Sequence, residues 1–470
     1  MGARAEGVRL PLLTAGGHAA MERPPKAAGA GPEAEAGPGP ASWGRVAVLA
    51  GATAACYGTV GLLLATTPVA ATRLQRLELA SLPMMCEGLG RAAGGGALPR
   101  LLAPHGRRRV LCAATVVGLV GYAAACAALA VESYGLFATA MFCCGISNAA
   151  GTVLRFVAGD CVRAAEKSRA ISLTTLGGLV GALVGPQLAR EGRRLVGTTE
   201  FFGCYVFGGG LVILQGLLTA ACSLEPRAEA EGGGKAGEED GGGKEEGRAE
   251  AEIGLLEVFR RAPAVFIGSA SCVTVWAVMC LVMASVPLAV APKHGFDHSS
   301  TIIQLHLGLM FAPCLVNGWI IGRLGAFPVL VAGSTLYAAS AFFSFGSLEL
   351  WSVYACMACQ GVAWSWLYVG GSVLVAGGGG SAALGPREAA KARAANEMAT
   401  YTGVALAVGV AAYTFSSVGW KGVNQVTLAA MGLFTAFLVA AKRHLEPTAA
   451  GGGGGRGESP EAESAPNSAV

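Results

Sequence analysis

Charged side chains are scarce in this chain. Asp, Glu, Lys and Arg make up 14% of its 470 residues, whereas a typical soluble protein contains about 25%. A charge at the centre of a lipid bilayer costs at least about 2.5 kcal/mol, so the deficit favours a protein that lies within a membrane. The formal net charge of +4 is small and gives no support for nucleic-acid binding.

Motifs for catalysis, nucleotide hydrolysis and metal binding are also missing from the sequence. Lys235 and Lys244 follow glycines, but Ala and Glu come next instead of the Ser or Thr of a phosphate-binding loop. No His-Glu-x-x-His or Gly-x-Ser-x-Gly motif occurs. Cys356 and Cys359 have the spacing of a redox or zinc pair, but they lie in an apolar segment without a second pair. We therefore predict no enzyme, no catalytic residues, no cofactor and no metal site.

Long apolar segments dominate what the sequence does contain. We count twelve between about residues 45 and 445, most of them close to 20 residues long, and a helix of about 20 residues spans the roughly 30 Å of hydrocarbon in a bilayer. The segments are 46–68, 77–101, 110–131, 134–157, 170–189 and 201–223, then 264–290, 300–322, 327–346, 350–376, 395–416 and 421–441. The predicted fold class is an all-α polytopic membrane protein with twelve transmembrane helices in two six-helix bundles.

Polar stretches of low complexity divide the chain into domains. Residues 1–44 and 442–470 are predicted to be disordered tails, because they contain too few apolar residues to form a core. The first bundle is expected at 45–224 and the second at 263–441. Between them, the Gly, Glu and Lys content of 225–262 predicts a solvated linker that ends in a short interfacial helix.

Basic residues predict how the chain is oriented in the membrane. The loops after the second, fourth, eighth and tenth segments carry Lys or Arg, whereas the loops after the third and ninth carry neither. The positive-inside rule therefore places the basic loops, both termini and the linker in the cytosol. Arg190, Arg193 and Arg194 fall on the opposite side and are an exception. A plasma membrane and an organellar membrane fit this pattern equally well.

Gly177, Gly181 and Gly185 repeat every four residues in the fifth segment and end in Gly185-Pro186. Residues four apart line one face of a helix, so another helix can pack directly on this backbone. Pro186 removes a backbone hydrogen bond and permits a kink. The pattern predicts either a pliable helix that lets two bundles rock or a tight static contact.

This glycine-rich fifth segment, in a six-plus-six arrangement, resembles the major facilitator superfamily of secondary transporters. The loop that contains Arg107 and Arg108 is similar to the end of that superfamily's signature, Gly-x-x-x-Asp-x-x-Gly-Arg-Arg. Pro99 and Ala103 stand in place of its first glycine and its aspartate. The resemblance implies that the two arginines bind carboxylates or helix C-termini.

Further blocks of sequence resemble a mostly bacterial, poorly characterised branch of permeases in that superfamily. These blocks are Leu154–Asp160, Ser285–Ala289, Ile303–His306, Met310–Pro313, Trp364–Gly371 and Asn396–Glu397. The resemblance covers about residues 46–441. It implies two bundles around a central cavity that opens alternately to the two sides of the membrane.

The segment 300–322 offers the first candidates for a solute path. His306, Met310, Pro313 and Asn317 fall at helical spacing on one face, whereas Gln304 points elsewhere. An imidazole in hydrocarbon is costly unless it faces water or a partner, and histidine titrates close to neutral pH. The sequence therefore predicts His306 as a substrate or proton site, with Asn317 on the same path. The alternative is a neutral histidine that hydrogen-bonds a neighbouring helix.

Charged residues near the segment ends give further candidates. Glu397 lies one turn past Arg393, so it is either half of a surface ion pair or a cavity carboxylate that takes up a proton or pairs with a cationic solute. Arg155 and Asp160 close the fourth segment on the cytosolic side and are predicted to form an ion-pair gate. Asn148 shares the face of Arg155 and is predicted to line the path.

Isolated polar and aromatic residues complete the set of pathway candidates. Gln360 and Trp364 are one turn apart in the segment 350–376, where a tryptophan either stacks on a planar ligand or packs against neighbouring helices. Tyr57 in the first segment allows the same two interpretations. Glu87 interrupts the second segment together with Arg91, and we expect a functional role for it if that segment spans the membrane.

The sequence thus predicts a secondary active transporter of a small organic solute that works by alternating access. Coupling to protons fits His306 and Glu397, and the absence of a nucleotide-binding motif argues against ATP-driven transport by this chain alone. The expected partners are a small-molecule substrate, the lipid bilayer and protons, and we expect a monomer. The alternative is a non-transporting membrane sensor or scaffold with a transporter-like fold, which the altered signature loop at Ala103 and the polar second segment leave open.

Overall fold

A computed structural model describes residues 40–162, 167–196, 199–222, 255–376, 384 and 386–442. Every regular element within these ranges is a helix. The first half comprises α1 (Pro40–Leu74), η2 (Leu77–Leu79), α2 (Leu82–His105), α3 (Arg107–Ala130), α4 (Tyr134–Asn148), α5 (Ala150–Asp160), α6 (Lys167–Arg193) and α7 (Phe202–Ala221). The second half comprises α8 (Leu255–Arg261), α9 (Pro263–His294), α10 (Phe296–Phe311), α11 (Cys314–Leu324), α12 (Ala326–Phe343), α13 (Leu350–Val375) and α14 (Pro386–Ala441).

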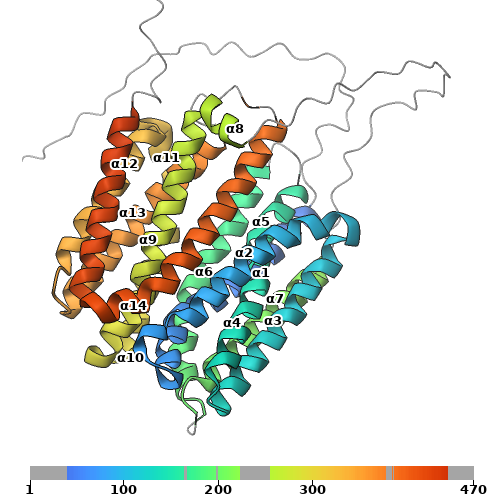
Figure 1. Cartoon of the computed structure of the whole chain (residues 1–470). Helices are drawn as coiled ribbons and strands as arrows, with labels where there is room; N and C mark the ends of the chain where they lie inside the picture. Colours follow the sequence, from blue (N-terminus) through green and yellow to red (C-terminus); the bar gives the residue numbers. More distant parts are fainter. Residues whose placement is uncertain are drawn as a thin grey trace, which may run out of the picture.

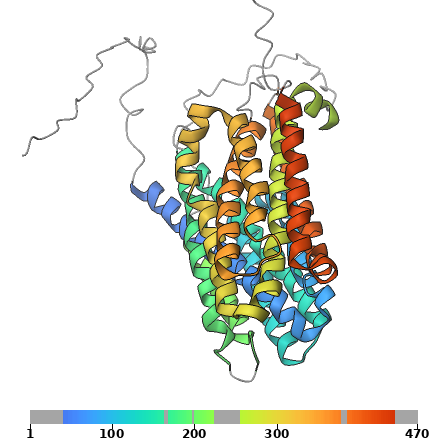
Figure 2. The same cartoon turned by 90° about the vertical axis from the view of Figure 1, so that its left-hand side faces the viewer.

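The two halves lie side by side, blue to green and yellow to red in Figure 1, and a view at right angles is given in Figure 2. Helix α8 marks one end of the molecule, where α14 also ends. We call this the α8 end and the other the opposite end. If the positive-inside rule holds for this chain, the α8 end faces the cytosol.

Several helices are long and apolar enough to cross a bilayer. Among the described residues, six helices have the length and apolar composition of a membrane span. A seventh span is present if α10 and α11 together form one span that is bent by 44°. One of the six is α14, which Gly419 divides into two helices by its positive φ of 65°. This break falls between the predicted segments 395–416 and 421–441. The predicted all-α membrane fold is therefore confirmed, whereas the domain boundaries stay predictions.

Three of the predicted segments are interrupted in the structure. The segment 77–101 begins with the short helix η2, which is separated from α2 at Ala80 and Ser81. The segment 134–157 is divided into α4 and α5 at Ala149, and the segment 300–322 is divided into α10 and α11 at Ala312 and Pro313. Proline lacks a backbone N–H and its ring crowds the preceding turn, which accounts for the bend between α10 and α11. The break after α4 leaves Asn148 as the last residue of its helix.

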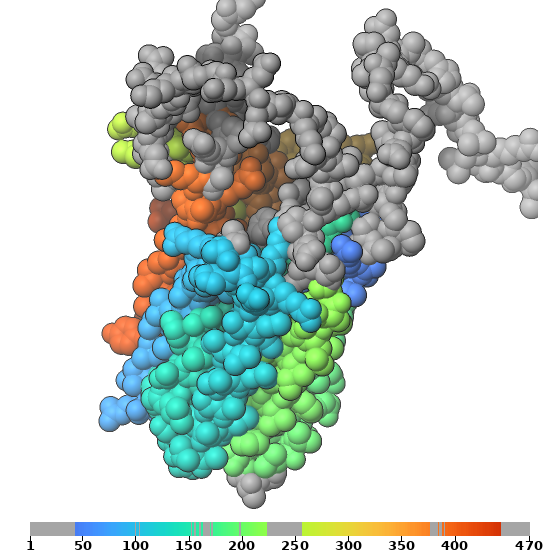
Figure 3. Space-filling view, turned by 90° about the vertical axis from the view of Figure 1, so that its right-hand side faces the viewer, coloured from blue at the N-terminus to red at the C-terminus, as the bar shows by residue number. Residues whose placement is uncertain are grey.

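The surface of the first half is apolar where helices would meet lipid. Figure 3 shows this face, with α3, α4 and α7 covering most of the coloured surface and the orange α14 along one edge. Exposed aliphatic and aromatic side chains on these helices are Val116, Val120, Leu136, Phe142, Ile213, Leu214 and Leu217. Such a broad exposed apolar surface is expected of a helix bundle in a bilayer, not of one in water.

Candidate transport site

The two halves are joined at the opposite end by contacts between α6 and α10. The Ser300 hydroxyl donates to the carbonyl oxygen of Pro186 at 2.6 Å, and the Gln304 amide donates to that of Leu183 at 2.5 Å. Arg190 in turn donates to the Gln304 amide oxygen at 3.3 Å. Both carbonyl oxygens on α6 therefore accept hydrogen bonds from α10, which belongs to the other half.

A second contact at the opposite end joins α2 to α14. The Ser81 hydroxyl donates to the carbonyl oxygen of Gly409 at 3.3 Å and accepts from the backbone N–H of Ala412 at 3.1 Å. Beside the α6–α10 contact, the rings of Phe201 and Phe296 pack edge to face with centroids 5.3 Å apart. The opposite end is therefore closed by polar and aromatic contacts between the halves.

The α8 end is organised differently. The largest buried apolar cluster contains residues of both halves. Three smaller clusters each belong to one half: the clusters around Leu154 and around Val46 to the first, and the cluster around Val265 to the second. Val46 lies in the first part of α1 and Val265 in the first turn of α9, so each half has a small buried cluster of its own at the α8 end.

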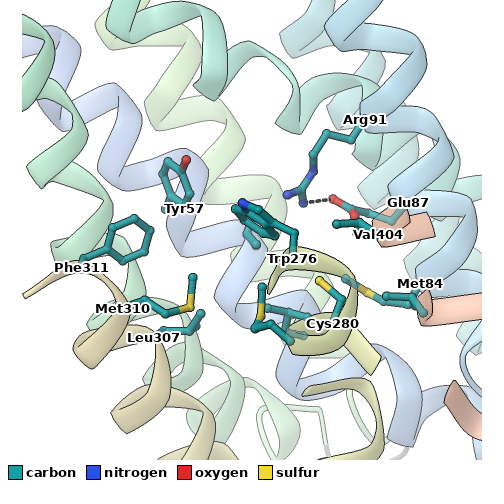
Figure 4. A pocket seen from close by; sticks show the side chains of 14 residues that line it. Tyr57, Met84, Glu87, Arg91, Trp276, Cys280, Leu307, Met310, Phe311 and Val404 are labelled. Carbon is teal, nitrogen blue, oxygen red and sulfur yellow. Dashed lines mark hydrogen bonds and ion pairs between the residues drawn. The ribbon is translucent and has the colours of Figure 1, made fainter. Parts of the chain in front are cut away.

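A pocket lies between the halves, and we call it the central pocket (Figure 4). It contains about 520 Å³ of space between atoms, including the part that opens to solvent. Helices α1, α2, α9, α10 and α14 contribute its walls. The lining residues are Tyr57, Val60, Leu64, Met84, Glu87, Arg91, Trp276, Met279, Cys280, Leu307, Met310, Phe311, Val404 and Val408.

An ion pair on α2 provides the only charged side chains among the described residues that line the central pocket. Arg91 donates from Nη2 to Oε1 of Glu87, one turn earlier, and the two side chains are only 9% and 3% exposed. The side-chain amide nitrogen of Asn148 donates to the same Glu87 oxygen at 2.8 Å, and the Thr59 hydroxyl donates to the side-chain oxygen of Asn148 at 2.8 Å. The pair is formally neutral, and α1 and α4 hold its carboxylate in place.

Aromatic rings from both halves surround the central pocket. Trp276 packs edge to face on Trp364 and Tyr368, with centroid distances of 5.1 and 5.8 Å. Tyr57 of the first half packs edge to face on Phe311 at 5.3 Å, and Phe311 lies 6.3 Å from Trp364. This set of rings can hold a flat solute, because aromatic faces favour stacked and edge-on contacts.

The structure places three of the seven predicted pathway residues at or beside the central pocket. Tyr57 and Glu87 line it. Trp364 lies directly behind the lining, in contact with Trp276 and Phe311, and is 1% exposed. These three residues come from α1, α2 and α13, so they meet only in the folded molecule.

The other uncharged candidates lie between helices of the second half. His306 is fully buried, with Nδ1 2.9 Å from the carbonyl oxygen of Met357 on α13. Asn317 donates to the Ser365 hydroxyl on α13 at 2.9 Å. Gln360 is fully buried, and its amide is 3.4 Å from the Cys356 sulfur. None of the three candidates lines the central pocket.

The charged candidates other than Glu87 do not line the central pocket. Glu397 is half-buried on α14, close enough to Tyr401 and to Cys272 of α9 to interact electrostatically. Arg107 and Arg108 begin α3, the first half-buried and the second exposed. The side chains of Arg155 and Asp160 lie outside the described residues, so their proposed gate stays a prediction.

The glycine stripe of α6 packs on α1, which belongs to the same half. A Cβ placed on Gly177, Gly181 or Gly185 would lie 2.2 to 2.3 Å from a backbone oxygen of α1. The stripe therefore gives close helix contact within the first bundle, whereas the carbonyl oxygen of Pro186 accepts a hydrogen bond from Ser300 of the other half.

Sequence reasoning missed several lining residues. Arg91 was noticed only as an interruption, although its spacing from Glu87 already allows an ion pair on one helix face. Trp276 and Phe311 carry no signal of their own, because an aromatic residue in an apolar segment is usually core. No group of His, Cys, Asp and Glu side chains suited to a metal occurs among the residues with described positions.

Comparison with known proteins identifies the class of protein that this fold and pocket define. The sequence profile described as "Major Facilitator Superfamily" matches residues 48–377. The chain therefore belongs to this superfamily of membrane transporters and is an integral, multi-pass membrane protein.

Individual relatives agree with this assignment. The riboflavin transporter RfnT of Brucella anthropi is 28% identical over 377 residues, covering 80% of this chain and 87% of RfnT. The uncharacterised MFS-type transporter YdeG of Bacillus subtilis is 24% identical over 330 residues, covering 68% and 75%. Among solved structures, a D-xylose–proton symporter superposes with a TM-score of 0.66 at 12% identity, covering 86% of this chain and 98% of that one. The nucleoside transporter NupG superposes with a TM-score of 0.59 at 14% identity, covering 86% of this chain and 100% of that one.

Proposed function

We propose that this protein carries a flat aromatic solute of the flavin class across the membrane by alternating access. The observation that carries the proposal is the central pocket, which both halves line and which aromatic rings of both halves surround. Because a solute in this position touches both halves, relative motion of the halves changes the side from which it is reached.

The contacts between the halves support an inward-facing state. Hydrogen bonds from Ser300, Gln304 and Ser81 join the halves at the opposite end, whereas the buried clusters at the α8 end belong to one half each. With the α8 end in the cytosol, the central pocket opens toward the cytosol. Transport then requires that the contacts at the opposite end break while others form at the α8 end.

The chemistry of the walls supports a neutral, aromatic solute. Among the described lining residues, only Glu87 and Arg91 are charged, and their charges compensate each other, so this lining has no net charge to attract an ion. The remaining lining is aliphatic, aromatic or sulfur-containing. The similarity to RfnT, which is named a riboflavin transporter, favours flavins among the flat solutes.

We assign proton coupling to Glu87 instead of His306. Glu87 lines the central pocket and shares an oxygen with Arg91 and Asn148, whereas His306 is enclosed between α10 and α13. A solute that engages Arg91 would compete with Glu87 for its donors. A carboxylate that loses its cationic partner away from water takes up a proton, which would link solute binding to protonation.

Uptake by proteoliposomes tests both parts of the proposal. Vesicles that contain the purified chain should exchange radiolabelled riboflavin against unlabelled riboflavin inside, and an imposed pH gradient should drive net uptake. Glu87→Gln should keep exchange but lose the response to the pH gradient. Absence of exchange in the wild type contradicts flavin transport, and a gradient response that survives Glu87→Gln contradicts this assignment of the proton site.

A further inference from the structure

The walls of the central pocket differ between its two ends. Helices α1 and α9 and the part of α14 before Gly419 run away from the α8 end, and α2 and α10 run toward it, so chain position gives the height of each lining residue. The level nearer the α8 end contains Tyr57, Arg91, Trp276, Phe311 and Val404. The level nearer the opposite end contains Leu64, Met84, Cys280, Leu307 and Val408. Figure 4 shows the same separation, with Arg91 and Tyr57 above Met84 and Leu307.

The level nearer the α8 end contains two hydrogen-bond donors that are not paired with an acceptor among the described residues. Arg91 Nε and Trp276 Nε1 are buried and have no hydrogen-bond partner in the part of the chain that the structure describes. Guanidinium and indole groups donate and do not accept. Each such donor costs free energy while it is buried and unpaired, so a ligand with acceptors at this level would satisfy both.

Neighbouring groups fix these donors in place. Trp276 contacts three rings, because Tyr401 lies 6.5 Å from it in addition to Trp364 and Tyr368. Arg91 is oriented by its bond to Glu87. Donors that are already oriented lose little entropy when a ligand binds, so their direction can select among ligands.

The level nearer the opposite end is apolar and adaptable. Its side chains are aliphatic or contain sulfur, and Met279 and Met310 extend this surface. Thioethers are polarisable, take several rotamers and make favourable contacts with aromatic rings. This end therefore accepts hydrocarbon and offers nothing that a carbonyl group could pair with.

We infer that the central pocket recognises one edge of its solute. The solute is a flat conjugated ring system with carbonyl acceptors along one edge and hydrocarbon at the other, and it binds with the acceptor edge against Arg91 and Trp276. This inference rests on the proposed function, in which the central pocket is the solute site. A flavin ring meets both demands, because its pyrimidine-dione edge carries two carbonyl groups and its benzenoid edge carries two methyl groups.

Binding of two tricyclic probes to the full chain in nanodiscs tests this inference. Lumiflavin has the carbonyl edge and lacks the sugar chain, whereas phenazine is a tricycle without carbonyl groups. The wild type should bind lumiflavin more tightly than phenazine. Trp276→Phe keeps an aromatic ring and removes the donor. It should therefore lower the affinity for lumiflavin about 3- to 10-fold, which corresponds to the loss of one hydrogen bond. The affinity for phenazine should not change.

A control and a second variant keep the result interpretable. Trp420 is also buried with an unpaired Nε1 among the described residues, but it does not line the central pocket, so Trp420→Phe should change neither affinity. Arg91→Lys keeps the charge and removes the Nε donor, and it should reduce the preference for lumiflavin even if Trp276→Phe does not fold. An unchanged ratio of the two affinities in the folded variants overturns the inference.

The outcomes also separate this inference from the proposed function. Riboflavin exchange with no preference for lumiflavin over phenazine would retain flavin transport and contradict recognition of the edge. A preference for lumiflavin without riboflavin exchange would retain recognition of the edge and contradict flavin transport. A wild type that neither exchanges riboflavin nor binds lumiflavin contradicts both.

Discussion

Replacing Arg91 by methionine removes the cationic half of the buried pair on α2. Glu87 would then keep its hydrogen bond from Asn148 but lose its only ion-pair partner, at a position where its side chain is 3% exposed. Removing one partner of a buried ion pair costs about 3–5 kcal/mol, because the other charge is left uncompensated. We expect the free energy of unfolding of Arg91→Met to fall by an amount near the lower end of this range, since the carboxyl group can take up a proton.

The double variant Glu87→Gln/Arg91→Met provides the sharper comparison. Both charges are gone, and the new amide oxygen can still accept the hydrogen bond from Asn148. Replacing both partners of a buried pair is often neutral or stabilising, so the double variant should recover to within about 1–2 kcal/mol of the wild type. Its stability should return while riboflavin exchange stays lost, because the donors of Arg91 are absent.

Unfolding in mixed detergent micelles, followed by far-ultraviolet circular dichroism, measures these differences. The exposed pair of Lys293 and Glu349, with side chains 48% and 64% exposed, supplies the control. Lys293→Met should change stability by no more than about 1 kcal/mol. If Arg91→Met is as stable as the wild type, or if the double variant is no more stable than the single one, the account of a coupled buried pair is refuted.

Three further expectations concern the helix contacts. Gly181→Val should abolish folded protein in fluorescence-detected size-exclusion chromatography, because its Cβ would lie 2.3 Å from a backbone oxygen of α1; Gly210→Ala, where a Cβ meets nothing within 4 Å, should be neutral or stabilise by about 0.5–1 kcal/mol. His306→Leu should cost about 1 kcal/mol for its lost hydrogen bond and leave riboflavin uptake and its response to a pH gradient unchanged; a lost response would restore His306 as the proton site. Gln304→Leu removes two hydrogen bonds that close the opposite end. This loss should destabilise the state closed at that end by about 2 kcal/mol relative to the open state, which is some 30-fold in their ratio. Labelling of Cys280 in the central pocket by an impermeant thiol reagent added from that end should rise, and unchanged labelling by mass spectrometry would contradict the assigned closure.

The fold was predictable because it depends on composition over long stretches. Lipid excludes charge from every helix surface that it touches, so the apolar segments, and the polar stretch between the halves, were visible without a structure. Breaks at single residues were harder to predict. Pro313 marks its bend in the sequence, whereas nothing in the sequence around Ala149 indicates that α4 ends at Asn148.

The candidate site was predictable only in part. A polar residue is conspicuous in an apolar segment, but the sequence does not show which groups surround it in the folded molecule. Glu87 and His306 are equally conspicuous in apolar segments, yet one lines the central pocket and the other faces Met357. Which face of a helix meets the cavity depends on how the helices pack against one another. Trp276 illustrates the reverse case, since only the assembled helices show that it lines a cavity and that its ring nitrogen is buried without a partner among the described residues.

Solute exchange by two variants of α14 tests the central claim most directly. Val404, before the break at Gly419, lines the central pocket, and Leu433, after the break, is 73% exposed on the outer surface. In proteoliposomes, radiolabelled riboflavin should exchange through the wild type and through Leu433→Trp, and Val404→Trp should block exchange because the larger ring fills the central pocket. Equal exchange by Val404→Trp and the wild type would show that the solute takes another route and would contradict the account.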